Sequence, residues 1–143
     1  MREVKVSVIM PFHNGEEYLS ETMAAILNQT LKEIEIICVD DESTDRTVML
    51  LQEYEKKDGR ITVLQQKKAN AGAARNLGRQ KACGEYLLFL DSDDLFEPDM
   101  LEKMYAACKE SQADVCVCNA DQYDTLKLSL IHISEPTRLA LIS

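Results

Sequence analysis

The chain has 143 residues, of which 45% are hydrophobic and 29% are charged, and its formal net charge is -9. These values are ordinary for one soluble domain that buries a sizeable core. The negative charge argues against nucleic acid as a partner, because phosphate contacts need clustered Lys and Arg. The sequence also contains no apolar run of about 18 residues that could span a membrane.

The first predicted unit is a strand followed by a helix. Residues 4–10, VKVSVIM, form a short β-branched run that predicts a buried strand, and Pro11 is expected to end it. Asn14 is expected to cap the following helix, with Glu17 three residues later completing a capping box. Apolar residues then recur at helical spacing to about residue 30.

The second predicted unit repeats this order. Residues 33–39, EIEIICV, predict a strand that runs into Asp40 and Asp41. Ser43 is expected to cap a second helix, and Gly59 is expected to close it.

The pattern continues to about residue 120. Residues 61–66 predict a third strand, residues 69–83 a helix rich in small residues, and residues 85–91 a fourth strand. Pro98 suits the first turn of a helix that reaches about residue 111, and residues 113–120 predict a fifth strand. Strands alternating with helices predict an α/β fold, with a Rossmann-like, mostly parallel sheet covered by helices on both faces.

The last part of the chain does not fit this pattern. Residues 126–143 show no clear period of either a strand or a helix. We therefore expect one partial domain at residues 1–125, followed by a tail that is non-native. A real but irregular tail is the alternative.

Acidic residues gather where the predicted strands end. In open parallel sheets, ligands bind outside the carboxyl ends of the strands. Divalent Mg²⁺ or Mn²⁺ prefers carboxylate oxygens, and such a cation would offset the repulsion within the cluster. The alternative is that these side chains only cap the turns and helices that follow. The residues are Asp40, Asp41, Asp91, Asp93 and Asp94.

Three stretches in order resemble family 2 glycosyltransferases of the A-type fold. They are VSVIMPFHNGEEYLSETMAAILNQT, EIICVDDESTDRT and NAGAARNLGRQKACGEYLLFLDSDD, and together they span nearly all of the chain before the tail. The resemblance implies a transferase that binds a nucleotide-sugar donor, most often a UDP-sugar, with Mn²⁺ or Mg²⁺ at a D-x-D motif. It also implies inverting transfer of a hexosyl group to an acceptor hydroxyl, in polysaccharide biosynthesis.

The resemblance implies roles for individual residues. Asp41 would accept a hydrogen bond from the base and Asp40 would support the ribose, whereas Arg75 would face the donor. A surface ion pair is the alternative for Arg75, and simple packing in the loop is the alternative for His13. The implied donor-binding residues are Pro11, Phe12, His13, Asp40, Asp41, Arg75, Asp91 and Ser92. The implied metal ligands are Asp93, Asp91 and Asp94.

The catalytic base has no candidate in this sequence. The resemblance implies that a further half, which binds the acceptor, supplies this base, and Asp121 and Asp124 come too early for the role. We therefore expect the chain to be a donor-binding portion that is inactive alone. A saccharide or lipid-linked acceptor and a cytoplasmic location follow from the resemblance, with peripheral membrane association through regions outside this chain.

Two other classes of protein compete with this interpretation. A metal-dependent nucleotide-binding module without catalysis would bind the donor but transfer no sugar. Phosphoacceptor signalling domains also gather aspartates, but they place the acidic pair after the first strand and a Lys after the fifth. Here the pair follows the second strand, and the fifth ends in Asn119 and Ala120.

Overall fold

The computed structural model describes residues 3–67, 70–92, 95–112, 117–120 and 133–137. Strands and helices alternate from β1 to β5, as the sequence predicts. In chain order the elements are β1 (Val6–Phe12), α1 (Leu19–Leu27), β2 (Ile34–Asp41), α2 (Thr47–Lys57), β3 (Ile61–Gln66), α3 (Ala71–Lys81), β4 (Tyr86–Phe89), α4 (Met100–Glu110), β5 (Val117–Ala120) and β6 (Ile133–Thr137).

The main sheet has the strand order β3-β2-β1-β4, and all of its neighbouring strands are parallel. The strands end at two opposite sides of the sheet, which we call the carboxyl edge and the amino edge after the strand ends that lie there. The carboxyl edge is formed by Phe12, Asp41 and Leu90, and the amino edge by Lys5, Glu33, Arg60 and Glu85. Because β2 and β4 both pair with β1, the carboxyl ends of these three strands lie side by side, as expected. The sheet reverses its direction of growth between β1 and β4, which makes this the switch point where ligands bind in such folds.

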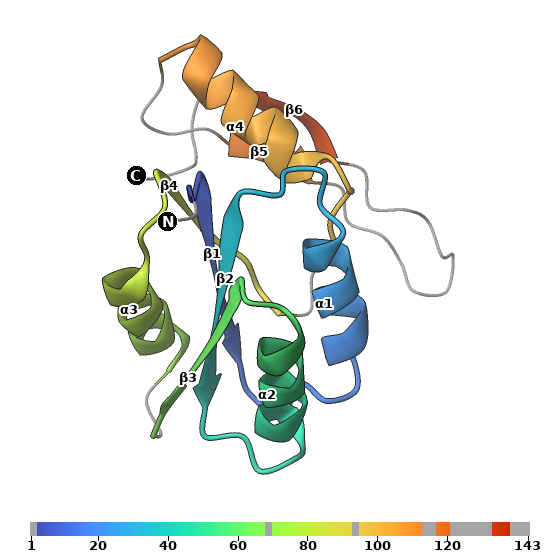
Figure 1. Cartoon of the computed structure of the whole chain (residues 1–143), viewed down its shortest axis with the longest axis vertical. Coiled ribbons are helices and arrows are strands. Elements are labelled where there is room, and N and C mark those ends of the chain that lie inside the picture. Colours follow the sequence, from blue (N-terminus) through green and yellow to red (C-terminus); the bar gives the residue numbers. More distant parts are fainter. Residues whose placement is uncertain (1–2, 68–69, 93–94, 113–116, 121–132, 138–143) are drawn as a thin grey trace.

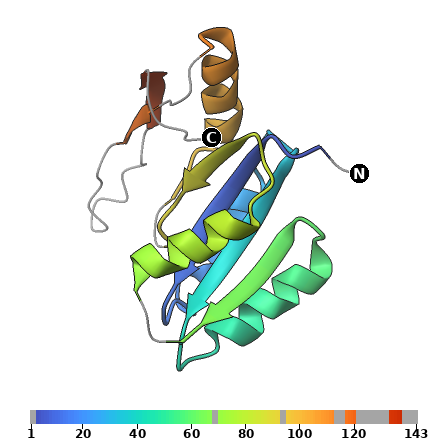
Figure 2. The same ribbon diagram turned by 90° about the vertical axis from the view of Figure 1, so that its left-hand side faces the viewer.

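Helices cover both faces of the sheet (Figures 1 and 2). Side chains of a strand point alternately to its two faces. Val8, Met10 and Phe12 therefore lie in the larger core with α1, α2 and α4, whereas Ile9 lies in a smaller core with Ala74 of α3. This arrangement confirms the predicted α/β fold with a covered parallel sheet.

Helix α3 approaches the sheet closely at Gly78. A Cβ atom at this position would lie 2.5 Å from Cγ2 of Ile9, which no real contact allows. Glycine is therefore required for this approach, and the approach determines how far α3 and its Arg75 lie from β1.

Pro11 lies inside β1, although the sequence analysis expected it to end the strand. The strand continues to Phe12, which is in register with Asp40 of β2. On the other side, Ile9 accepts a hydrogen bond from the amide of Leu90 at 3.0 Å, so Pro11, two residues later, also faces β4. A proline has no N–H to donate to the carbonyl of Leu90, and the β1–β4 ladder ends there.

Two predicted helix caps are wrong. Helix α1 begins at Leu19 after Tyr18, and Asn14 lies earlier in the loop with a φ of 50°. Helix α2 begins at Thr47 after Arg46, so Ser43 does not cap it. In both places the polar side chain bonds to a more distant part of the chain instead. By contrast, the Oδ1 atom of Asn70 accepts from the amide of Ala73 at 2.8 Å and caps α3.

The fifth strand forms outside the main sheet. β5 pairs with β6 in an antiparallel sheet of two strands. β6 lies within the segment for which the sequence predicts no regular element, and its Pro136 is in register with Cys118. A proline lacks a ladder donor and weakens the strand pattern in the sequence. The domain boundary near residue 125 lies outside the described residues and stays a prediction.

Acidic side chains at the amino edge have cationic or hydroxyl partners. Lys5 Nζ lies 3.4 Å from Glu33, and Arg60 Nη2 lies 3.0 Å from Asp58. Glu85 binds Lys109 Nζ at 2.7 Å and the hydroxyl of Tyr105 at 2.8 Å, which ties α4 to the start of β4. The hydrogen bond from Lys109, with that from Tyr105, lowers the pKa of Glu85. Burial and Glu85 raise the pKa of Tyr105 to about 12.

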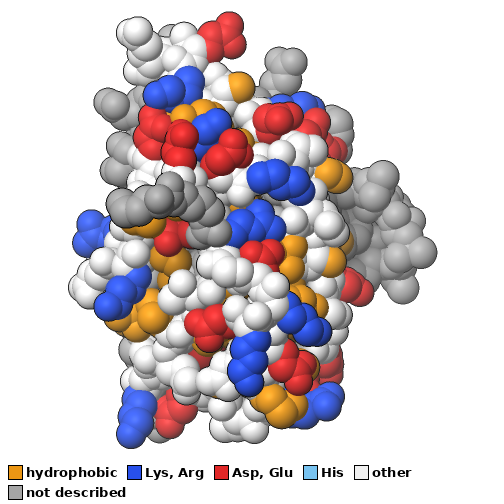
Figure 3. Space-filling model, viewed as in Figure 1, with side chains coloured by type: hydrophobic (Ala, Val, Ile, Leu, Met, Phe, Trp, Pro, Cys, Tyr) orange, Lys and Arg blue, Asp and Glu red, His pale blue; other side chains and the backbone are white. Residues whose placement is uncertain are grey.

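The surface mixes charges of both signs. On the face shown in Figure 3, basic and acidic side chains alternate, and apolar side chains appear only in small groups. In the described ranges, each helix is too short or too polar to serve as a membrane span.

Candidate functional site

A cavity of about 320 Å³ opens at the carboxyl edge, where β1, β2 and β4 end. Six of its lining residues come from the predicted donor site, and the other two are Tyr18 and Ala71. The lining consists of Pro11, Phe12, His13, Tyr18, Asp41, Ala71, Asp91 and Ser92. The cavity therefore combines the carboxyl edge, the loop before α1 and the start of α3.

One wall of the cavity is formed by His13 and Asp41. Nδ1 of His13 lies 2.7 Å from the backbone carbonyl oxygen of Asp41. A carbonyl oxygen can only accept, so Nδ1 carries the hydrogen and donates it. Nε2 lies 3.4 Å from the Nδ2 atom of Asn14, which can donate to it. Nδ1 thus donates one hydrogen bond and Nε2 accepts another, and together they fix the orientation of the imidazole.

Asp40 and Asp41 lie in different environments. Asp40 is 2% exposed, and its carboxylate accepts from the amide of Ser43 at 3.0 Å and from the hydroxyl of Ser43 at 2.5 Å. Asp41 is half-buried and lines the cavity. β2 extends through both residues, so their side chains point to opposite sides. The structure therefore places Asp41 in the cavity and Asp40 beneath the loop that follows it.

The loop after β2 is held by Asp45. Its Oδ1 atom accepts from the amide of Thr47 at 2.9 Å and from the hydroxyl of Thr47 at 2.5 Å. Burial raises the pKa of Asp45, but the hydrogen bonds from Thr47 and the amide of Glu16 outweigh it, so the pKa lies below its usual value. The carboxylate is ionised at neutral pH and accepts hydrogen bonds from the first residue of α2 and from the loop after β1.

The other wall is acidic. The exposed carboxylate of Asp91 lies 3.2 Å from Nη2 of Arg75, which reaches it from α3. Both predicted interpretations of Arg75 thus remain compatible with the structure, because the ion pair lies beside the cavity. Asp93 and Asp94, the other predicted metal ligands, lie outside the described residues.

Helix α1 anchors the segment that follows β4. The hydroxyl of buried Thr22 donates to the backbone oxygen of Ser92 at 2.5 Å, and the hydroxyl of Tyr18 lies 3.5 Å from Oγ of Ser92. The fully buried amide of Gln29 donates to the carbonyl of Glu97 at 2.7 Å and accepts from the amide of Leu101 at 3.0 Å. One buried side chain of α1, Thr22, and one that follows its C-terminal end, Gln29, therefore satisfy backbone groups at both ends of this segment.

Tyr18 and Ala71 line the cavity but were not predicted as site residues. Tyr18 falls in a stretch that the sequence assigned to a helix, but it belongs to the loop that lines the cavity. Ala71 is the first residue of α3 and has no chemistry to single it out. An aromatic residue shortly after a strand end was the one signal available for Tyr18.

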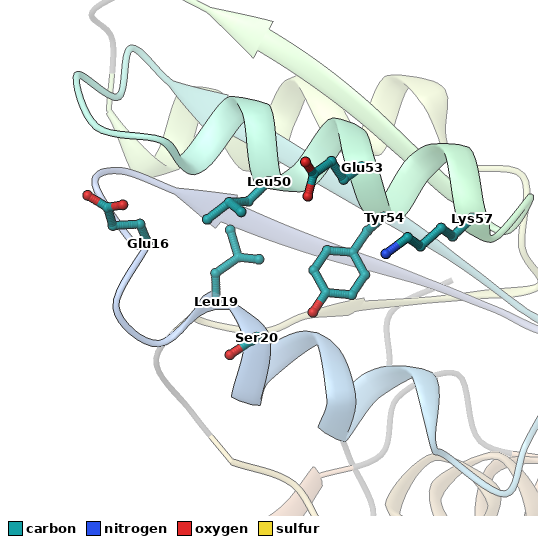
Figure 4. A pocket seen from close by; sticks show the side chains of 7 residues that line it. All are labelled: Glu16, Leu19, Ser20, Leu50, Glu53, Tyr54 and Lys57. Carbon is teal, nitrogen blue, oxygen red and sulfur yellow. The ribbon is translucent and has the colours of Figure 1, made fainter.

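A second cavity of about 280 Å³ lies between α1 and α2. Figure 4 shows Leu19 of α1 facing Leu50 and Tyr54 of α2, with charged side chains around them. It shares no lining residue with the cavity at the carboxyl edge. Its lining is Glu16, Leu19, Ser20, Leu50, Glu53, Tyr54 and Lys57.

The cation site can be tested only in part against the described residues. Among them, no three His, Cys, Asp or Glu side chains are grouped as a metal site requires. Asp91 contributes one carboxylate on the cavity wall, and carboxylate oxygens are the ligands that Mg²⁺ and Mn²⁺ prefer. The donor type fits, and the remaining predicted ligands follow Asp91 directly in the sequence.

Comparison with known proteins identifies the family. The model of glycosyl transferase family 2 matches residues 7–139. The chain belongs to this family. A poly(ribitol-phosphate) beta-glucosyltransferase of Bacillus spizizenii is 39% identical over 116 residues, which are 78% of this chain and 18% of that enzyme.

Solved structures of glycosyltransferases share the fold. S. aureus TarS, residues 1–349 in complex with UDP, is similar with a TM-score of 0.72 and 34% identity, over 80% of this chain and 34% of TarS. GalNAc-T7 with UDP, GalNAc and Mn²⁺ is similar with a TM-score of 0.70 and 26% identity, over 81% of this chain and 23% of that chain. These similarities confirm the A-type glycosyltransferase fold expected from the sequence.

The family 2 chain is short beside its relatives. It spans between 16% and 40% of the length of the first curated relatives it matches. The matched part includes the three strand ends and the cavity between them.

Proposed function

We propose that this family 2 chain binds the nucleoside diphosphate sugar donor of an inverting glycosyltransferase, with a UDP-sugar as the preferred donor. One observation carries the proposal, namely the cavity at the switch point between β1 and β4. Its lining joins six residues to which the family resemblance assigns a role in donor binding. The proposed acceptor is a saccharide or lipid-linked hydroxyl, and no described residue is assigned as its base.

The nucleoside side of the proposed site is formed by His13 and Asp41. A carboxylate can accept the imide N–H of uracil, and Asp41 lines the cavity with its side chain half-buried. The imidazole of His13 lies beside it, oriented by the carbonyl of Asp41. The similar TarS structure is a complex with UDP, which supports a uridine donor.

The diphosphate side is formed by Arg75, Asp91 and Ser92. We propose that Asp91, Asp93 and Asp94 hold Mn²⁺ or Mg²⁺, which when bound neutralises the departing diphosphate as a Lewis acid. The guanidinium of Arg75 already bonds to Asp91 and can supply hydrogen bonds to phosphate oxygens. The similar GalNAc-T7 structure contains Mn²⁺ together with UDP, which supports a divalent cation as part of the site.

Calorimetric titration of UDP, GDP and ADP in the presence of Mn²⁺ tests the proposal. UDP is expected to bind most tightly, and Asp41→Ala is expected to lose most of this preference because the base then loses its acceptor. Glu42→Gly is the matched control, since Glu42 is exposed, adjacent in sequence and at a φ of 51° that glycine adopts readily. Equal affinities for the three nucleotides would remove the base-reading role of Asp41. Absence of nucleotide binding would overturn the proposed function.

A further inference from the structure

Two loops at the carboxyl edge are joined by one side chain. The loops are residues 13–18, between β1 and α1, and residues 42–46, between β2 and α2. Oδ1 of Asn14 accepts from the amide of Thr44 at 2.8 Å, from its hydroxyl at 3.3 Å and from the amide of Asp45 at 3.4 Å. The backbone amide of Asn14 donates to Oγ of Ser43 at 2.8 Å. Asn14 therefore contacts three consecutive residues of the opposite loop.

Further hydrogen bonds join the same two loops and the start of α2, and we call this whole set of bonds the seam. The amide of Gly15 donates to the hydroxyl of Thr47 at 2.9 Å, and the amide of Glu16 donates to Asp45 at 3.3 Å. The guanidinium of Arg46 bonds to Glu16 at 2.8 Å. Of these joining residues, Asn14 is the one directly adjacent in sequence to a lining residue of the cavity, His13.

The backbone of both loops is unusual at the seam. Asn14 has a φ of 50° and Glu42 a φ of 51°, values in the left-handed region. Asparagine adopts this region more readily than most residues, whereas glutamate adopts it at a cost in free energy. Such a backbone persists when the surrounding contacts determine it, and here those contacts include the bonds of Asn14 to residues 43–45.

We infer that Asn14 is a positioning residue that fixes His13 against Asp41 and so shapes the nucleoside side of the cavity. The seam brings the loop after β1 onto the loop after β2, and the bond between His13 Nδ1 and the carbonyl of Asp41 is 2.7 Å long. The Nδ2 atom of Asn14 faces Nε2 of the same ring at 3.4 Å. Asn14 does not line the cavity itself and acts through His13 and Asp41, which do. The inference rests on the proposed function, because it assumes that a nucleoside occupies the cavity beside His13.

The test separates the side chain of Asn14 from its backbone. Asn14→Gly keeps the left-handed backbone and removes every side-chain bond, whereas Asn14→Asp keeps the acceptor oxygen for Thr44 and Asp45 and loses only the Nδ2 donor to His13. Calorimetry with UDP and Mn²⁺ is expected to show a loss of at least about fivefold in affinity for Asn14→Gly, a change of about 1 kcal/mol. Asn14→Asp is expected to recover most of that loss.

Asp58→Ala is the stability control. Asp58 accepts from the amide of Arg60 at 3.0 Å, its Nε at 3.2 Å and its Nη2 at 3.0 Å, so it also holds a loop, but at the amino edge. Thermal melts should show a decrease in Tm for both Asp58→Ala and Asn14→Gly, whereas only Asn14→Gly should lose affinity for UDP. Equal UDP affinity in Asn14→Gly and the wild-type chain would overturn the inference.

A second measurement does not depend on a ligand. Nitrogen-15 NMR of the imidazole reports whether Nδ1 of His13 carries the hydrogen, and this state is expected in the wild-type chain and in Asn14→Asp. Asn14→Gly should lose it in part as the ring becomes free to reorient. If the wild-type chain bound no nucleotide, the proposed function would fail, and this spectrum would still decide whether Asn14 positions His13. An unchanged spectrum in Asn14→Gly would overturn the positioning role.

Discussion

Carboxylates occupy both edges of the main sheet, but their partners differ. At the amino edge, Glu33, Asp58 and Glu85 each lie within ion-pair distance of a Lys or Arg. At the carboxyl edge, Asp41 and Asp91 line a cavity, and Asp91 has Arg75 beside it. The same residue type therefore joins elements to one another at one edge and faces a cavity at the other. We expect substitutions at the amino edge to change the free energy of unfolding and those at the carboxyl edge to change donor affinity.

Removal of the metal is expected to produce the largest effect and tests the carboxyl edge. Two unit charges about 4 Å apart repel by roughly 4 kcal/mol at an effective dielectric constant of about 20, so the acidic wall should reject a diphosphate without a cation. EDTA should abolish UDP binding. Asp93→Ala should weaken it at least tenfold, about 1.4 kcal/mol or more, with Asp93→Asn between that variant and the wild type. Calorimetry with and without Mn²⁺ measures this, and metal-independent binding would contradict the D-x-D assignment.

Asp40 is an exception among the carboxylates of the carboxyl edge. It lies at the carboxyl edge, yet it is buried and both of its oxygens bond to Ser43. Asp40→Ala is expected to destabilise the fold by roughly 2 kcal/mol, because hydrogen bonds to a charged group are lost. Asp40→Asn keeps one acceptor and should cost less. Urea unfolding measures both variants, and a drop in UDP affinity without a drop in stability would return Asp40 to the donor site.

Asp58 tests the structural role of the carboxylates at the amino edge. Asp58→Ala removes the ion pair with Arg60, whose partners are partly exposed, so a loss of about 1 kcal/mol or less is expected. UDP affinity should stay unchanged because the residue lies at the opposite edge of the sheet. Urea unfolding paired with calorimetry gives both values. Weakened binding in this variant would show that the two edges are coupled.

Glu85 is expected to give the smallest effect, and it depends on pH. The hydrogen bonds from Lys109 and Tyr105 lower its pKa in the folded chain from an ordinary value of 4.5. Its contribution is therefore complete above that ordinary value and is lost as the pH falls through the lower, folded pKa. The difference in stability between the wild-type chain and Glu85→Gln should be present at about pH 6 and shrink toward about pH 3. A difference that grows on acidification would contradict the assigned ion pair.

Sequence reasoning located the cavity because parallel strands place their carboxyl ends together. The order β2-β1-β4 brings Phe12, Asp41 and Asp91 to one edge, and the motifs already marked those positions. It did not separate Asp40 from Asp41. Both follow an apolar run, but β2 continues through them, so alternation sends one carboxylate inward and one to the cavity.

Sequence reasoning failed where a local signal competed with a distant partner. Asn14 and Ser43 have the side chains of helix caps, and each precedes a helix. In the structure they bond to each other's loops, because the two strands before them are paired in register. A polar side chain of this kind can either cap the next helix or bond to a distant loop. The outcome depends on residues about thirty positions away, and a local sequence pattern does not show that contact. The individual donor and metal roles stay predictions.

Pro11 also has a consequence for the width of the cavity. Because it offers no hydrogen to the carbonyl of Leu90, β4 cannot continue to pair with β1, and the chain is released from the sheet just before Asp91 and Ser92. A residue with an N–H at this position would allow β4 to continue its pairing with β1, and Asp91 would then lie closer to β1. The proline thus acts as a spacer between the ends of β1 and β4, at the point where the cavity opens.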